Sequence, residues 1–124
     1  MDRKTILAID DSAISLRSVK TVLEDLYSVR MAKTTALASG VLRKEHIDLI
    51  LLDIEMPGDI SGIDYLKVLK AAPETRDIPV IMLTGHSSFE TISNATWGGA
   101  ADYVIKPFDP VVLHEKVLGI FLNQ

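Results

Sequence analysis

Residues 49–58 read LILLDIEMPG, and this stretch decides the fold. An apolar run this short, with charge before it and Pro57 and Gly58 after it, predicts a strand that is buried on both faces. Asp53 lies where the run stops. A carboxylate at the end of a central strand costs free energy unless water, a cation or hydrogen-bond donors satisfy it. Asp53 could cap the following turn, or it could be a nucleophilic or metal-binding carboxylate at the mouth of a sheet.

The composition is that of one globular domain covering residues 1–124. The chain is 48% hydrophobic and 24% charged, and it has no cysteine, which excludes disulfides and thiolate metal sites. No apolar run reaches the ~18 residues of a membrane span. The N-terminus leads directly into a strand-like run, which leaves no room for a signal peptide and favours the cytoplasm. The net charge of −4, with scattered basic residues, argues against direct binding of nucleic acid.

Strand-like and helix-like segments alternate along the chain. Apolar runs predict strands over residues 6–9, 27–32, 47–53, 78–83 and 103–105. Helical spacing and capping signals predict helices over residues 12–26, 34–44, 63–72, 88–97 and 110–121. Short connections between such segments predict an α/β fold, a doubly wound five-stranded parallel sheet with helices on both faces. In sheets of this kind, ligands bind beyond the carboxyl ends of the strands, where the strand order reverses.

The sequence also predicts where one helix begins and which side chains of the helices are packed. Asp109 followed by Pro110 predicts the start of the last helix. Leu26 is expected to continue the first helix, and Leu37 to face the core from the second. Trp97 is interpreted as packing at the end of its helix, next to two glycines.

Four predicted strands end in polar residues, which are Asp10 with Asp11, Asp53, Thr84 and Lys106. Parallel strands bring these ends to one edge of the sheet. Carboxylates gathered there repel one another, and Mg²⁺, which prefers oxygen ligands, relieves the repulsion. A lysine and a hydroxyl beside a metal-bound carboxylate suit the stabilisation of a transferred phosphoryl group, and an aspartate can accept that group. Taken singly, the acid pair could cap a helix and the lysine could be solvated, but their joint occurrence favours a site.

The chain resembles the receiver domain of two-component response regulators over essentially its full length. The resemblance rests on four motifs, IDDS at residues 9–12, LLDIEMPG at 51–58, LTG at 83–85 and YVIKPF at 103–108. It implies a flavodoxin-like sheet with strand order 2-1-3-4-5. It also implies a signalling switch rather than an enzyme, one that promotes its own phosphorylation and dephosphorylation after meeting a histidine kinase or phosphotransfer protein.

The same resemblance assigns the acceptor and the metal ligands. Asp53 would accept the phosphoryl group from a phosphohistidine of the partner kinase. Asp11 would bind Mg²⁺ directly and Asp10 mainly through water, while the backbone carbonyl of Glu55 would complete the ligands that the protein provides.

Further residues of the site follow from the family pattern. Lys106 would contact a phosphoryl oxygen, Thr84 would move to hydrogen-bond the phosphoryl group, and Tyr103 would turn inward into the vacated space. The Lys106–Pro107 peptide bond is expected to be cis.

Two variable positions, Glu55 and His86, are expected to tune how long the acyl phosphate lasts. His86 could lie near the phosphoryl group or could face water, and the sequence does not decide between the two. The output face is expected on the helix 88–97, the last strand and the helix 110–121, where a protein partner or a second copy of the domain would bind. Its candidate contacts are Ile92, Thr96, Tyr103 and Lys116.

One loop departs from the family's commonest pattern, and two other functions compete. The loop 57–62 is one residue longer, which places Asp59 further from Gly62 and leaves the loop's shape open. A phosphohydrolase of the haloacid-dehalogenase type would use Glu55 as acid and base, but those enzymes usually have aspartate there and a longer chain. A degenerate receiver that only binds partners is disfavoured by the complete set of site residues.

Overall fold

The computed structural model describes residues 3–85 and 89–123, and within them strands and helices alternate as expected. The strands are β1 (Thr5–Ile9), β2 (Ser28–Ala32), β3 (Leu49–Asp53), β4 (Val80–Thr84) and β5 (Asp102–Ile105). The helices are α1 (Ala13–Leu23), α2 (Thr35–Lys44), α3 (Gly62–Ala71), α4 (Phe89–Trp97) and α5 (Pro110–Leu122). His86 and the predicted capping signal at residues 87–88 lie outside the described residues. The side chain of Ile92 is also not described.

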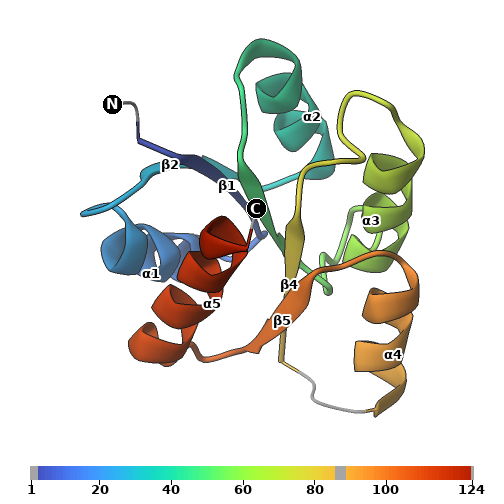
Figure 1. The fold of residues 1–124 in the computed structure, drawn as a ribbon. Helices are drawn as coiled ribbons and strands as arrows, with labels where there is room; N and C mark the ends of the chain where they lie inside the picture. Colours follow the sequence, from blue (N-terminus) through green and yellow to red (C-terminus); the bar gives the residue numbers. More distant parts are fainter. Residues whose placement is uncertain (1–2, 86–88, 124) are drawn as a thin grey trace.

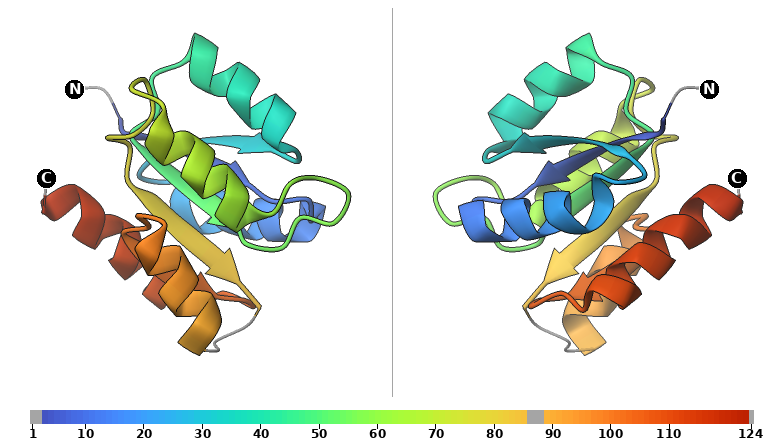
Figure 2. Two further views of the ribbon diagram at one scale, coloured as in Figure 1. Left: turned by 90° about the vertical axis from the view of Figure 1, so that its right-hand side faces the viewer. Right: turned by 90° about the vertical axis from the view of Figure 1, so that its left-hand side faces the viewer.

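The strands form one parallel sheet in the order β2-β1-β3-β4-β5, which confirms the expected topology (Figure 1). Helices α1 and α5 cover one face, and α2, α3 and α4 cover the other (Figure 2). Alternate residues of each central strand enter the two cores, so that Leu7 and Ile9 meet α2 and α3 while Ile6 and Ala8 meet α1 and α5. This two-sided burial explains why the central strands read as unbroken apolar runs.

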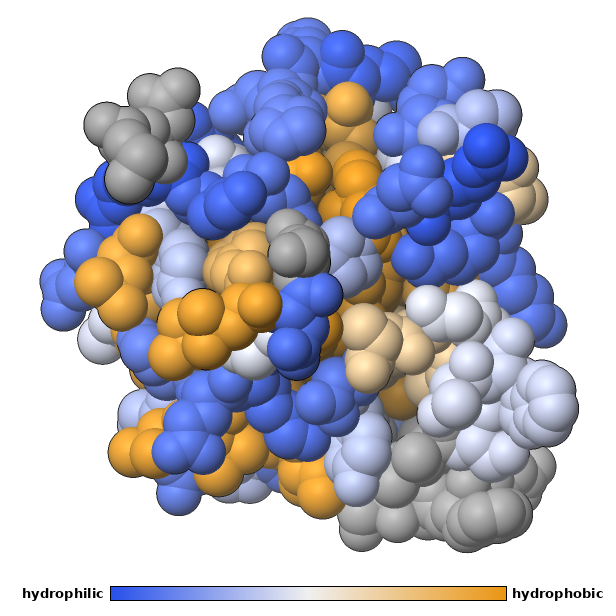
Figure 3. All heavy atoms as spheres, in the orientation of Figure 1, coloured by the Kyte–Doolittle hydropathy of each residue, from blue (hydrophilic) through white to orange (hydrophobic). Residues whose placement is uncertain are grey.

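Side-chain caps fix where four helices begin. Ser12, Thr34, Ser61 and Asp109 each accept a hydrogen bond from a backbone N–H of the following first turn. Pro110 follows its cap directly, where its missing N–H costs nothing. No helix among the described residues is both long and apolar enough to span a membrane. In the view of Figure 3, hydrophobic side chains form separate patches among hydrophilic ones.

Two expected core residues lie at the surface instead. Helix α1 ends at Leu23, and Leu26 is 54% exposed while its neighbour Tyr27 is buried. In α2, Leu37 is 58% exposed, and Thr35 and Ala38 are the buried residues. The small side chain of Ala38 faces the sheet, and this register turns Leu37 outward.

Trp97 does not pack as expected, because its side chain is 88% exposed. At this end of α4, two glycines lie against side chains of α3. A Cβ added to Gly98 would lie 2.9 Å from Cδ2 of Leu66, and one added to Gly99, whose φ is +100°, would lie 3.2 Å from Cγ of Lys70. Since the glycines approach α3 so closely, the indole is left on the outside.

The structure defines the loop between β3 and α3, whose shape the sequence left open. The Asp59 carboxylate accepts hydrogen bonds from the Thr35 backbone N–H at 2.7 Å and from the Thr35 hydroxyl at 2.8 Å. The Thr35 N–H is the main reason that the pKa of Asp59 lies below its usual value. The loop is thereby tied to the first turn of α2, where a negative charge is favourable.

The other end of this loop fits only a glycine. The Gly62 N–H donates to the Ile54 carbonyl at 2.9 Å, and an added Cβ would collide with the carbonyl oxygen of Asp53. Gly40, in the middle of α2, has no such neighbour within 4 Å.

Gly62→Ala should therefore destabilise the fold, and Gly40→Ala is its matched control. We expect Gly62→Ala to lower the free energy of unfolding in urea by about 2–3 kcal/mol, because the backbone of β3 must shift. Gly40→Ala should leave it unchanged or raise it by up to about 1 kcal/mol. Equal stability of the two variants would contradict the close contact at the end of β3.

Candidate functional site

The candidate site lies at the carboxyl edge of the sheet, between β1 and β3, where the strand order reverses. Asp10 follows β1 directly, and Asp53 ends β3. Asp53 is in register with Leu83, so Thr84 ends the neighbouring strand one residue further on. Lys106 follows the last residue of β5, Ile105, which is in register with Thr84. The topology therefore brings together the four strand ends that the sequence singled out.

Three carboxylates gather at this edge. Asp10 and Asp53 are 0% and 3% exposed, while Asp11 is exposed. One oxygen from each of the three lies within 4.8 Å of the others. Oδ1 of Asp10 accepts the Ser12 N–H at 2.9 Å, and Oδ1 of Asp53 accepts the Glu55 N–H at 3.1 Å. Each buried carboxylate thus has one oxygen held by backbone and one directed elsewhere.

The Lys106 ammonium lies against both buried carboxylates. Its Nζ is 2.5 Å from Oδ2 of Asp10 and 3.3 Å from Oδ2 of Asp53. The Lys106 N–H donates to the Thr84 carbonyl at 2.8 Å, and the bond to Pro107 is cis, as expected. One ammonium faces three carboxylates, so the cluster keeps an excess of negative charge when all are ionised.

The surroundings of Asp53 also change its acidity. Burial raises its pKa to about 6 from 3.8, and the negative charge of Asp10 adds to the effect. Lys106 and the Glu55 N–H lower the pKa, but they do not cancel the increase. An oxygen-only set of carboxylates fits a hard divalent cation, which would compensate the negative charge and favour the ionised form of Asp53. Within the described part of the chain, this is the one such group of three potential ligands.

The remaining predicted residues lie around the cluster or beyond it. Thr84 is fully buried at the end of β4, and Glu55 is exposed directly beyond β3. Tyr103, on β5, is half-buried, and Nζ of Lys116 lies 4.5 Å from its ring centroid. Lys116 also donates to the Tyr103 carbonyl at 2.6 Å and to Oδ1 of Asp102 at 3.0 Å.

The sequence did not reveal the backbone donors of the site. The N–H groups of Ser12 and Glu55 hold the two buried carboxylates, but every residue except proline has an N–H, so no sequence signal marks them. Gly62 was also missed as a support of Asp53. The signal for Gly62 was its position directly after Ser61, which caps α3, in the loop that follows Asp53.

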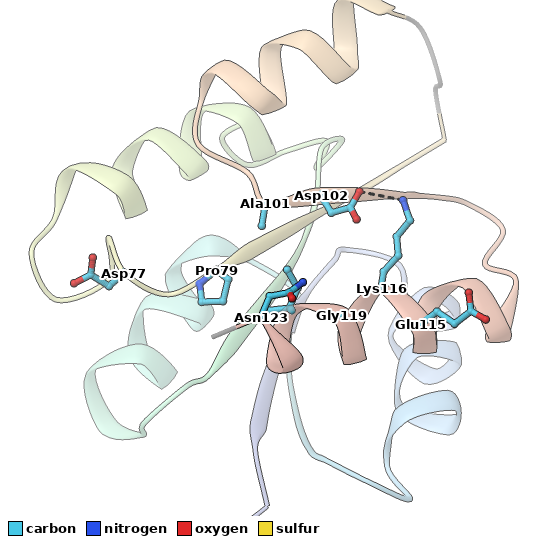
Figure 4. Close-up of a pocket in the computed structure, with 9 residues that line it drawn as sticks. Asp77, Pro79, Ala101, Asp102, Glu115, Lys116, Gly119 and Asn123 are labelled. Atoms are coloured by element: carbon cyan, nitrogen blue, oxygen red, sulfur yellow. Dashed lines mark hydrogen bonds and ion pairs between the residues drawn. The ribbon is translucent and has the colours of Figure 1, made fainter.

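A hollow of about 590 Å³ lies at the opposite edge of the sheet and does not belong to this cluster (Figure 4). It is an open trough between the amino ends of β4 and β5 and the last turns of α5, lined by Pro79, Asp102 and Asn123 among others. Its lysine, Lys116, is already paired with Asp102. The hollow is therefore separate from the carboxylate cluster at the strand ends.

Comparison with known proteins agrees with this geometry. The family model of the response regulator receiver domain matches residues 6–118. Chemotaxis protein CheY-3 of Vibrio cholerae is 36% identical over 118 residues, which cover 94% of this chain and 90% of that protein. The phosphate regulon transcriptional regulatory protein PhoB of Pseudomonas aeruginosa is 40% identical over 118 residues, which cover 94% of this chain and 51% of PhoB.

Solved structures show the same fold. Chemotaxis protein CheY4 of Vibrio cholerae matches with a TM-score of 0.89 at 28% identity, over 96% of this chain and 99% of that one. A response regulator from Chloroflexus aurantiacus matches with a TM-score of 0.89 at 30% identity, over 96% and 98% of the two chains.

The raised pKa of Asp53 predicts that the stability of the metal-free protein depends on pH. Between about pH 4 and pH 6 the folded protein holds a proton that the unfolded chain releases, so stability falls as pH rises through this range and the loss persists above it. In EDTA near pH 7, Asp53→Asn should be more stable than the wild type by about 1–3 kcal/mol. The gain should vanish near pH 4, and the exposed control Asp64→Asn should show no such gain. A less stable Asp53→Asn protein near pH 7 would refute this account of the charge balance.

Proposed function

Because the chain belongs to the response regulator receiver domain family of two-component systems, we propose that it is a phosphoryl-accepting signalling switch, with residues 1–124 forming one receiver domain. Receiver domains are signalling domains that interact with histidine kinases or phosphotransfer proteins. The observation that carries the proposal is the buried pair Asp10 and Asp53, whose Oδ2 atoms share the ammonium of Lys106. With one ammonium against two buried carboxylates, the cluster keeps an excess of negative charge that a bound cation would compensate.

Asp53 is the proposed acceptor, and its two oxygens have different tasks. Oδ1 is held by the Glu55 N–H, which leaves Oδ2 as the nucleophile. In the transfer, Oδ2 forms a bond to phosphorus while the bond from phosphorus to the histidine nitrogen of the partner breaks, and the imidazole leaves. The Lys106 ammonium, already 3.3 Å from Oδ2, then pairs with a phosphoryl oxygen.

The proposed cation is Mg²⁺, held by Asp10, Asp11, Asp53 and the backbone carbonyl of Glu55. When bound, Mg²⁺ supplies positive charge against the phosphoryl oxygens. Asp10 keeps Lys106 at the site, and Asp11, which is exposed, can meet the cation with little cost in desolvation.

Thr84 and Tyr103 are the proposed switch residues. The Thr84 hydroxyl would hydrogen-bond the phosphoryl group, and the Tyr103 ring would turn inward in response. Glu55 and His86 would tune the lifetime of the acyl phosphate. Glu55 is exposed and lies two residues after Asp53, so that its carboxylate can meet incoming water. This position supports the assignment of Glu55.

The proposed output face consists of α4, β5 and α5, and it would bind a protein partner or a second copy of the domain. Among its candidate contacts, Thr96 is exposed, and Lys116 and Tyr103 are half-buried. Apolar side chains accompany them, since Ile105 is 43% exposed and Val112 is 41% exposed. A mixed apolar and basic surface of this kind suits a protein partner.

Phosphorylation tests the acceptor directly. With acetyl phosphate and Mg²⁺, the intact mass of the protein should rise by one phosphoryl group, and Asp53→Asn should prevent the increase because no carboxylate remains at that position. Asp64→Asn is the control and should be modified as the wild type is. Modification of Asp53→Asn at the wild-type rate would refute the assignment. Many turnovers of an aryl phosphate would instead favour the phosphohydrolase.

Mg²⁺ binding should be visible in thermal stability. Mg²⁺ at about 100 times its Kd should add about 2.7 kcal/mol to the free energy of unfolding and raise Tm by several degrees. Asp11→Ala should remove most of this rise without harming the fold, because its side chain is exposed, and Asp10→Ala should reduce the rise somewhat less. A wild-type Tm that is indifferent to millimolar Mg²⁺ would contradict the proposed ligands.

Amide exchange should locate the output face. Addition of beryllofluoride, which mimics the phosphoryl group, should change protection most over residues 84–108, because Thr84 and Tyr103 are expected to move together. The control is Asp53→Asn, which should not respond. A change confined to residues 12–44 would place the output surface elsewhere.

A further inference from the structure

A groove between α3 and α4 has no part in the proposed phosphoryl chemistry. It is a hollow of about 480 Å³ on the outer side of the two helices. Its main lining residues are Ile63, Lys67, Lys70, Asn94, Trp97 and Gly98. It lies on the side of α4 that faces α3, and none of these residues belongs to β5 or α5.

Trp97 gives this groove an exposed aromatic wall. Its side chain is 88% exposed, the largest fraction among the exposed large hydrophobic residues. The exposure follows from the close approach of Gly98 to Leu66, which leaves no space for an indole on the inner side of α4. Tryptophan side chains that stand free at a groove are frequent anchors of protein partners, because they bury a large apolar area and keep one N–H donor.

The charged side chains that the structure describes in the groove are both lysines. Lys67 is exposed, and within residues 3–85 and 89–123 it makes no hydrogen bond or ion pair. Lys70 is half-buried and donates to the carbonyls of Arg76 at 3.1 Å and Ile78 at 2.8 Å. No carboxylate is among the described side chains that line the groove. The groove is therefore locally basic on a chain whose net charge is −4.

We propose that this groove binds a short acidic segment of a partner protein, with an apolar side chain against Trp97 and a carboxylate on Lys67. The exposed Asn94 amide offers hydrogen bonds to the backbone of such a segment. Two lysines are too few to hold a polyanion on an acidic domain, which favours a peptide over nucleic acid. The volume of about 480 Å³ suits a few residues of an extended or helical segment.

A peptide selection tests the proposal, and the single tryptophan of the chain reports on it. A displayed library of random twelve-residue peptides is selected on the wild-type domain. Peptides rich in Asp and Glu with an apolar residue should be enriched, and a synthetic copy of one should shift Trp97 emission to shorter wavelengths. Lys67→Glu should weaken its binding about tenfold or more, as loss of a charge-assisted hydrogen bond does.

Trp97→Ala should also weaken binding about tenfold, measured by calorimetry, since this exposed side chain contributes little to the fold. Lys20→Glu makes the same change of charge at an exposed residue of α1, and it should alter binding less than about twofold. Selected peptides that bind Lys67→Glu as well as the wild type, or a selection without acidic enrichment, would overturn the proposal. A blue shift of Trp97 with protein concentration alone, or with an oligonucleotide, would replace the peptide by a second copy or by nucleic acid.

Discussion

The contact of one ammonium with two buried carboxylates is the constraint on which the rest of the structure depends. Asp10 and Asp53 are almost fully buried, and two like charges side by side in a poorly solvated place would not be tolerated alone. Lys106 pairs with both of them, but burial and, after it, the charge of Asp10 still raise the pKa of Asp53 to about 6. The parallel sheet makes the arrangement possible, because it brings the ends of β1, β3 and β5 to one edge although these strands are far apart along the chain.

The sheet and its site could be predicted because their signals are local and redundant. Strands buried on both faces read as apolar runs, and each run ends in the polar residue that enters the site, as Asp53 does after β3. The capping residues Thr34 and Asp109 likewise act within their own first turns. The order of the strands required the family resemblance, since periodicity alone does not say which strands are neighbours.

The errors concern residues whose environment is set by distant parts of the chain. Leu37 has the spacing of a core residue, but Ala38 faces the sheet and determines the rotation of α2. Trp97 was expected to pack because large aromatic residues usually do, and the contact of Gly98 with Leu66 removes the space it would fill. The partner of Asp59 is Thr35, 24 residues away, and a one-residue change in loop length gives no indication of such a contact.

The loop that follows Asp53 has two fixed ends. Asp53 belongs to the sheet at one end, and at the other Gly62 approaches the backbone of the same strand end, so both ends of the loop are held at the end of β3. The hydrogen bonds from Thr35 to Asp59 add a dependence of their own. A transplant of this loop into another receiver would need the start of α2 to be moved with it.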